Sequence, residues 1–216
     1  MRVTVKPVHI VIPPPKQARS AGVHVSNVIR SIAMETGVLA PQWVEELSLI
    51  EVKPSMQFLD PVVALRVCIG LAWEEWYIPQ VLGPEGVIDH PGEWECDGIY
   101  MSPDAEELAT IIIDRRPRHR LKVHEVKATY KSTNTVGETE EDLLSQFLWI
   151  SQLKAYCKGA KTRWADLHVL FLCGDYNYPI QPQKKRFQIE FEQEEIDDNW
   201  ELLTAYRDHK LQLEAQ

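Results

Sequence analysis

The sequence predicts an α/β (α+β) fold in which a central mixed β-sheet carries helices on its faces. The period of the hydrophobic residues changes along the chain in the order helix, two or three strands, helix, strand, with extra elements at both ends. The chain has 216 residues, a length that suits one domain with extensions better than two domains. We therefore expect one compact domain with an N-terminal arm and helical extension (1–58), a core (59–192) and a C-terminal acidic helix (193–216).

The individual elements follow from spacing and from boundary residues. Ser26 can cap a first helix that Gly37 ends, and Pro61 suits an early position of a second helix. The predicted helices cover 26–34, 61 to about 78, 141–157 (ended by Gly159) and about 196–213. The predicted strands cover 93–101, 108–113, 121–130, 167–173 and 186–191. Residues 3–12 alternate loosely and stop at a proline triplet, so we interpret them as a peripheral arm.

The charge balance limits the classes of function. A net charge of −9 disfavours a protein that binds nucleic acid through bulk charge. The positive charge is nevertheless concentrated, because segment 114–131 has seven bases and two acids and segment 154–163 has four bases and no acid. Two solvated faces are the simplest interpretation of these segments.

The lengths of the apolar runs and the spacing of the cysteines predict the cellular compartment of the protein. The longest apolar runs are far shorter than the roughly 18 residues that a membrane helix needs, and no basic start leads into an apolar signal segment. We expect a cytoplasmic protein with no membrane partner. The four cysteines form no C-x-x-C pair that would hold zinc, so free thiols are expected.

Carboxylates and a lysine on two strands are the candidate chemistry. Residues two apart on a strand share a face, so Glu125 projects beside Lys127, and Glu95 beside Asp97. If the strands are near neighbours, Asp97 and Glu125 converge, and paired carboxylates suit Mg²⁺ or Mn²⁺. The alternative for Glu125 and Lys127 is an ordinary salt bridge on a strand surface.

Gln152 and Tyr156, four residues apart, share one face of the predicted 141–157 helix. Taken alone, they could be an amide and a phenol at the boundary of an amphipathic helix. The order Asp97-Gly98, Glu125-Val126-Lys127 and Gln152-Leu153-Lys154-Ala155-Tyr156 resembles the PD-(D/E)XK nuclease superfamily, in particular its RecB-type, lambda-exonuclease-like branch with a Q-x-x-x-Y motif. The resemblance covers about 70–173, and the chain departs from it where Cys96, not proline, precedes Asp97.

The resemblance implies a restriction-endonuclease-like core with one or two Mg²⁺ or Mn²⁺ ions. Asp97, Glu125 and the Val126 carbonyl would be metal ligands, and Glu74, a few residues after a glycine on the earlier helix, would be a further one. Lys127 would orient the attacking water, and Gln152 and Tyr156 would contact the DNA backbone or a water beside the metal. No iron–sulfur cluster is expected, because the C-terminal segment lacks the cysteines that some members of the branch carry there.

The activity implied is that of a metal-dependent deoxyribonuclease in recombination, repair or phage DNA processing, more an exonuclease than an endonuclease. The residues expected to follow DNA phosphates are Lys131, Lys158, Lys161 and Arg163. The partners implied are DNA and a recombination or single-strand annealing protein, with a homo-oligomer also open. The alternative is a catalytically weak nuclease-fold module that binds DNA ends or a recombination partner.

Overall fold

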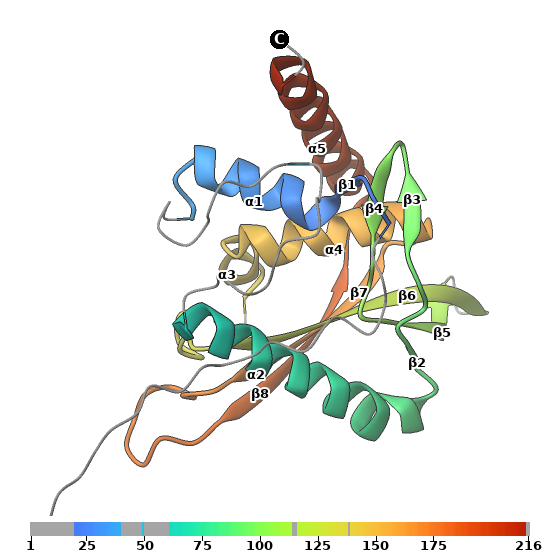
Figure 1. The fold of residues 1–216 in the computed structure, drawn as a ribbon. Coiled ribbons are helices and arrows are strands. Elements are labelled where there is room, and N and C mark those ends of the chain that lie inside the picture. Colours follow the sequence, from blue (N-terminus) through green and yellow to red (C-terminus); the bar gives the residue numbers. More distant parts are fainter. Residues whose placement is uncertain (1–19, 40–48, 50–60, 114–115, 138, 215–216) are drawn as a thin grey trace, which may run out of the picture.

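The computed structural model of the protein describes residues 20–39, 49, 61–113, 116–137 and 139–214 (Figure 1). The predicted arm at 3–12 and its proline triplet lie outside the described residues. The described part contains a three-stranded sheet in the order β1-β4-β3 and a five-stranded sheet in the order β2-β5-β6-β7-β8. None of its helices is both long enough and apolar enough to span a bilayer.

The five-stranded sheet is mixed, which confirms the predicted fold class. Its strands are β2 (Ile88–Asp89), β5 (Ala105–Ile113), β6 (Arg116–Thr129), β7 (Trp164–Phe171) and β8 (Gln183–Glu190). Only β6 and β7 run parallel, and all other neighbours are antiparallel. A parallel pair needs a crossover, which is provided here by α3 (Glu140–Leu144) and α4 (Phe147–Ala160).

The predicted strand at 93–101 is wrong, because the structure has a hairpin there. Strand β3 (Trp94–Cys96) turns back into β4 (Ile99–Met101), which also pairs in parallel with β1 (Val23–His24). The two turn residues, Asp97 (φ 48°) and Gly98 (φ 76°), both have positive φ, as a type I′ hairpin turn requires. Asp97 therefore lies at the tip of a hairpin and not in the middle of a strand.

The structure has helices in all the regions where the sequence predicts them, but the helix ends differ from the predicted ends. The first, α1 (Val25–Glu35), has His24 at its N-cap and not Ser26. The second, α2 (Pro61–Tyr77), continues into a π-helical turn at Ile78–Leu82 and a 3₁₀ turn at Gly83–Glu85. The predicted 141–157 helix is two helices, α3 and α4, and the last helix is α5 (Gln193–Glu214).

Gly159 does not end α4, contrary to the prediction, because Lys161 is the C-cap, in the left-handed region at φ 52°. A Cβ at Gly159 would lie 2.7 Å from Met101 Cε and 3.4 Å from the Trp94 ring. The glycine thus allows α4 to approach the β3–β4 hairpin closely.

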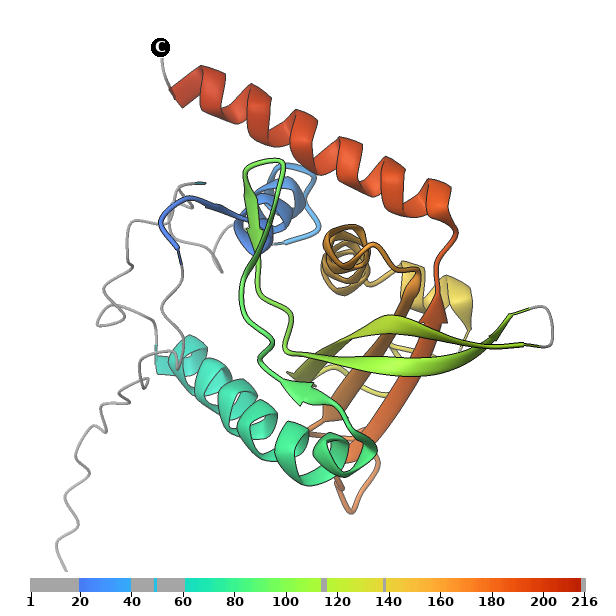
Figure 2. The ribbon, with the colours of Figure 1, turned by 90° about the vertical axis from the view of Figure 1, so that its right-hand side faces the viewer.

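The helices form two layers around the five-stranded sheet. Figure 2 shows α1, α4 and α5 on one side of this sheet and α2 on the other. The larger core lies under the first group and includes Leu153, Phe171 and Leu203, which are fully buried. A smaller core under α2 includes Tyr77 and Val126. Strand β6, whose two faces are both covered, is therefore the central strand of the domain.

Candidate active site

A pocket of about 350 Å³ opens beside the middle of β6. It lies between the first turns of α1, the end of α2, the β4–β5 connection and one face of α4. Its polar lining includes Glu74, Asp104, Glu125, Lys127, Gln152 and Tyr156.

Two carboxylates and one ammonium form the centre of the pocket. Alternation along β6 places Glu125 and Lys127 on one face, and the Lys127 ammonium donates a hydrogen bond to Glu125 Oε1. Asp104 is the last residue before β5, and Ala105 pairs with His124, so Asp104 lies beside Glu125. Its Oδ2 accepts a hydrogen bond from the Val126 amide at 2.7 Å, which fixes the carboxylate next to the strand.

The pKa values of all three groups in this cluster are shifted, because the groups are buried and close to one another. Burial raises the pKa of Asp104 well above its usual range, and the adjacent Glu125 carboxylate raises it further. Burial also raises the pKa of Glu125, against the opposing effect of the Lys127 ammonium. For Lys127 burial alone would lower the pKa, but the charges of Glu125 and Asp104 outweigh it, and the pKa is raised. One ammonium therefore holds two close carboxylates together.

The predicted convergence of Asp97 and Glu125 is wrong. Asp97 does not line the pocket; its Oδ2 accepts a hydrogen bond from Trp200 Nε1 at 2.8 Å, and its carbonyl accepts one from Arg207. The reason is the hairpin turn, which directs Asp97 towards α5. Asp104 lies where Asp97 was expected, and the signal for it was present in the sequence: Asp104 follows Pro103, whereas Asp97 follows Cys96.

Glu74 reaches the same cluster from α2. Its carboxylate is close enough to raise the pKa values of both Asp104 and Glu125. His90 holds it in place, because His90 Nε2 lies 2.9 Å from Glu74 Oε1 while the His90 amide donates to the Asp104 carbonyl at 3.0 Å. The hydrogen bond to Glu74 is the main reason why the pKa of His90 is raised.

Gln152 and Tyr156 line the pocket together, one helical turn apart on α4. Gln152 Nε2 donates a hydrogen bond to Tyr156 Oη at 2.6 Å, and Tyr156 Oη donates one to the Ser102 carbonyl at 3.0 Å. Since Ser102 is two residues before Asp104, this chain of hydrogen bonds fixes the connection that presents the carboxylate. The contact of Gln152 and Tyr156 with DNA stays a prediction.

The four predicted DNA-binding bases lie outside the pocket. Lys158 pairs with Asp197 of α5 at 2.6 Å, and Arg163 pairs with Glu190 at 2.5 Å and Glu192 at 3.4 Å. Lys131 donates to Gln146 at 2.5 Å and lies over the Trp149 ring, while Lys161 is exposed at the C-cap of α4. The acidic segment 190–201 therefore neutralises much of the basic cluster around α4. The role of these four residues stays a prediction.

The donor set of the pocket fits a divalent cation of the Mg²⁺ or Mn²⁺ type. Glu74, Asp104 and Glu125 provide hard carboxylate oxygens, which these ions prefer. The Glu125 side chain is fully buried, and its Oε2 has no hydrogen-bond partner among the described residues. A divalent cation would satisfy this oxygen and would offset the burial and the carboxylate repulsion that raise the pKa values of Asp104 and Glu125.

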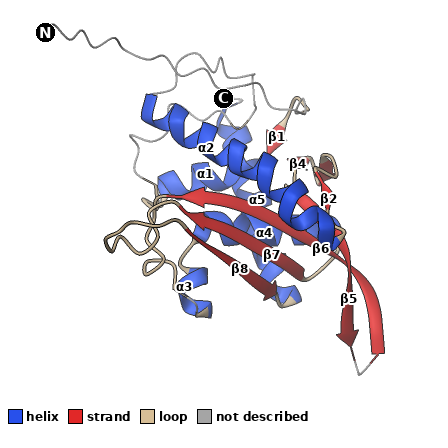
Figure 3. Ribbon diagram, turned by 90° about the horizontal axis from the view of Figure 1, so that it is seen from below, coloured by secondary structure: helices blue, strands red, loops and turns tan. Residues whose placement is uncertain are grey.

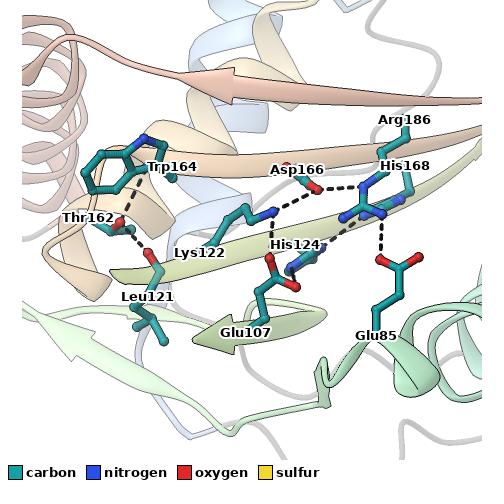
Figure 4. A network of polar contacts seen from close by, with 10 residues as sticks. All are labelled: Glu85, Glu107, Leu121, Lys122, His124, Thr162, Trp164, Asp166, His168 and Arg186. Carbon is teal, nitrogen blue, oxygen red and sulfur yellow. Dashed lines mark hydrogen bonds and ion pairs between the residues drawn. The ribbon is translucent and has the colours of Figure 1, made fainter. Parts of the chain in front are cut away.

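A second buried polar cluster lies on the α2 face of the sheet (Figure 4). His124, Asp166 and His168 come within 4.8 Å of one another, close enough for a metal ion. However, His124 Nδ1 and His168 Nε2 are 3.0 Å apart in nearly coplanar rings (15°), so the two imidazoles hydrogen-bond to each other. Cations from Lys122 and Arg186 already hold Asp166. We interpret this cluster as a structural hydrogen-bond network and not as a metal site.

Acid should therefore destabilise the fold through this histidine pair. Burial is the main cause that lowers the pKa of both His124 and His168 to about 3. An unfolded histidine titrates near pH 6.5, so its contribution to stability is full above about pH 6.5 and falls as the pH decreases towards 3. At about pH 5 the expected loss is about 2 kcal/mol per histidine.

The free energy of unfolding in urea is measured at about pH 7.5 and about pH 5. The decrease between the two pH values is compared for wild type and the double variant His124→Gln/His168→Gln. The groups that face the pair are Tyr77, Glu107, Lys122, Asp166 and Arg186, and all are retained in that variant. His209→Gln, on the exposed side of α5, is the control. Equal pH dependence of wild type and the double variant would contradict the prediction.

The mixed sheet, its helices on both faces and the carboxylate–lysine cluster on its central strand define an α+β fold with an acidic pocket beside its central strand. The chain shares this fold with a phage-related exonuclease from Haemophilus somnus 129PT, with a TM-score of 0.54 and 13% identity over 90% of this chain and 95% of that chain. At this identity the similarity shows the fold alone.

Weaker similarity exists to an alkaline exonuclease (LHK-Exo) from Laribacter hongkongensis, with a TM-score of 0.45 and 15% identity over 74% of each chain. The LHK-Exo complex with dAMP matches with a TM-score of 0.46 and 15% identity, over 90% of each chain. No family model matches the sequence, and no curated protein matches it significantly.

Proposed function

We propose that the protein is a metal-dependent nuclease of the PD-(D/E)XK superfamily that hydrolyses phosphodiester bonds in DNA. The main support is that Asp104, which follows Pro103, lines one pocket together with Glu125 and Lys127, which flank Val126 on β6. The fold shared with a phage-related exonuclease is consistent with it. The RecB-type branch is favoured by Gln152 and Tyr156, which line the same pocket.

Glu74, Asp104 and Glu125 would hold Mg²⁺ or Mn²⁺, with the Val126 carbonyl as a further ligand. When bound, the ion supplies Lewis-acid chemistry, which polarises a phosphate and lowers the pKa of a water. The chain itself contributes position, because His90 orients Glu74 and the Val126 amide orients Asp104.

Lys127 would act on the reacting groups. Its ammonium lies beside the carboxylates and on the pocket wall, where it can orient the attacking water and stabilise the charge that develops on the phosphate oxygens. Gln152 and Tyr156 extend the hydrogen-bonding surface on the opposite wall. Ser26 and Arg30, from the first two turns of α1, also line the pocket, and a helix N-terminus with an arginine favours a bound phosphate.

We infer further that the enzyme acts on DNA ends. The pocket is small, about 350 Å³, and three carboxylates lie at its centre, so a phosphodiester must be brought close to them. A net charge of −9 makes loose binding along a continuous duplex weak, which favours substrates that enter the pocket by an end.

Digestion of linear and covalently closed circular DNA, double- and single-stranded, with Mg²⁺ or Mn²⁺ tests this proposal. Linear molecules labelled at an end should be degraded from that end, whereas closed circles should largely survive. EDTA should stop the reaction. Rapid linearisation of closed circles at low enzyme concentration would show an internal cutter, and absence of any cleavage with either ion would reject the nuclease function.

A further inference from the structure

The hairpin formed by β5 and β6 extends beyond the rest of the sheet. Strand β7 pairs with β6 only from Val123 to Thr129, whereas β5 pairs with β6 as far as Ile113 and Arg116. Residues 107–113 and 116–122 therefore form a two-stranded projection, here called the β5–β6 ribbon. Figure 3 shows it running past the ends of β7 and β8.

The base of the ribbon is held firmly to the body of the protein (Figure 4). Lys122 Nζ joins Glu107 on the neighbouring strand at 2.6 Å and Asp166 of β7 at 3.3 Å. Arg186 of β8 also joins Asp166, at 2.7 Å, and the Thr162 hydroxyl donates to the Leu121 carbonyl. Since these contacts link the ribbon to β7, β8 and the segment before β7, the ribbon is a supported extension and not a loose loop.

Beyond this base, the ribbon carries an arginine row formed by Arg116, Arg118 and Arg120. The three residues alternate along β6, so they share one face, and all are exposed. Within the described ranges, no carboxylate lies within 4.0 Å of any of the three. Ile111 and Ala109 lie opposite Arg118 and Arg120 on β5, and Glu107, the acid of that strand on the same face, pairs with Lys122 at the base.

Several basic side chains near the ribbon and around α4, unlike the arginine row, form ion pairs with acids. Lys122 and Arg186 are paired with acids at the base, and Lys154, Lys158 and Arg163 are paired with acids of β8 and α5 or the residues between them. Within the part of the chain that the structure describes, the arginine row thus places three positive side chains without a carboxylate partner near the end of a projection. This is the charge pattern expected of a surface that meets a polyanion.

We propose that the β5–β6 ribbon is a second DNA-binding site, at which the arginine row contacts the phosphates of duplex DNA outside the active-site pocket. The proposal rests on the proposed nuclease function and names the ribbon as the place where the duplex next to the cleaved end is held. A two-stranded β-ribbon fits the major groove of B-DNA, and alternate residues on its strand are about 6.8 Å apart. The arginines can thus reach successive phosphates.

The distance between the ribbon and the pocket is compatible with this role. Arg120 and Arg116 are 7 and 11 residues before Lys127 on the same strand, so they lie at most about 23 and 36 Å from it along β6. At one base pair per about 3.4 Å, this corresponds to roughly 7 to 11 base pairs of duplex. Because these separations are odd, the arginine row lies on the α2 face of the strand, whereas Lys127 lies on the opposite face. A duplex that reaches both places must therefore pass round the edge of the ribbon, and binding at two sites would compensate for the negative net charge of the protein.

Protection of a strand edge is the competing explanation of the arginine row. Charged side chains and proline on exposed strands prevent association between sheets, and the ribbon also contains Pro117. That explanation predicts self-association after removal of the arginines and no effect on DNA. The two explanations are therefore separable by measuring both properties.

The test is binding of a fluorescent duplex of about 30 base pairs in EDTA, over about 0.05 to 0.3 M salt, with no cleavage. The variant Arg116→Gln/Arg118→Gln/Arg120→Gln should bind on the order of 10- to 100-fold more weakly at about 0.1 M salt. Its slope of log affinity against log salt should fall by about 2 to 3. The variant Arg116→Lys/Arg118→Lys/Arg120→Lys keeps the charge and should bind within about threefold of wild type.

The matched control is Lys154→Gln/Lys184→Gln/Lys210→Gln, which removes the same charge elsewhere and should keep the wild-type slope. Sedimentation checks that each variant remains folded and reports self-association. Unchanged DNA binding by the glutamine variant, with or without self-association, would overturn the proposal, and so would failure of the wild type to bind the duplex. Binding without cleavage in Mg²⁺ or Mn²⁺ would instead reject the nuclease function and leave the ribbon site supported.

Discussion

Replacement of Asp104 by asparagine should abolish DNA cleavage, whereas Asp97→Asn should leave the rate close to that of wild type. Asp104 is one of three pocket carboxylates, and its Oδ2 is fixed by the Val126 amide at 2.7 Å. Asparagine keeps that hydrogen bond but removes the negative charge that a divalent cation needs, so the rate should fall by on the order of 10³-fold or more. Asp97 lies outside the pocket and accepts hydrogen bonds from Trp200 and Arg207 of α5 and from the Cys96 thiol.

The two variants should also differ in stability. Burial and the Glu125 charge raise the pKa of Asp104, so Asp104→Asn removes a repulsive interaction, and the free energy of unfolding should stay constant or increase. Asp97→Asn turns a charge-assisted hydrogen bond to Trp200 into a neutral one and should cost about 1 kcal/mol or less. Cleavage rates at saturating Mg²⁺ and urea unfolding measure both effects. Loss of cleavage in Asp97→Asn as complete as in Asp104→Asn would contradict the assignment of the site.

Replacement of Lys127 by glutamine should separate metal binding from turnover. Lys127 would act on the water and on the developing phosphate charge and not on the ion, so the cleavage rate should fall by on the order of 10²- to 10⁴-fold. Removal of its positive charge makes the net charge of the pocket more negative, so Mn²⁺ should bind as tightly as in wild type or more tightly. Calorimetry with Mn²⁺ and single-turnover cleavage measure the two quantities.

Lys210→Gln is the control for Lys127→Gln, because Lys210 of α5 pairs with Glu35 of α1 and lies outside the pocket. It should keep both metal affinity and rate. If Lys127→Gln lost Mn²⁺ binding to the same extent as cleavage, the lysine would be needed to hold the carboxylates together, and its proposed action on the water would be wrong.

The sequence predicted the part of the site that depends on local periodicity. Strand alternation placed Glu125 beside Lys127, and helical spacing placed Gln152 beside Tyr156; the structure has both pairs in one pocket. These placements depend on one element each, so a period of 2 or 3.6 residues suffices. The mixed sheet followed from the order of such elements.

What the sequence did not predict depends on turns and on distant partners. Alternation continues through the two-residue turn at Asp97-Gly98, so the hairpin was interpreted as one strand, although Asp-Gly between alternating residues is a hairpin signal. That error led to the choice of Asp97 over Asp104. The pairing of Lys158 with Asp197 joins residues 39 apart in the chain, and no local pattern indicates it.

The three-stranded sheet beside the pocket links parts of the chain that are far apart in sequence. Its β1 strand pairs with β4 across about 76 residues, as Val23 with Ile99, and its hairpin turn is held by Trp200 and Arg207 of α5. Truncation before residue 36 or after residue 192 would keep every pocket carboxylate and Lys127, yet it would remove a wall of the pocket or the support of the hairpin. Loss of activity in such shortened proteins would report incomplete assembly of the domain and not a catalytic role for the segment removed.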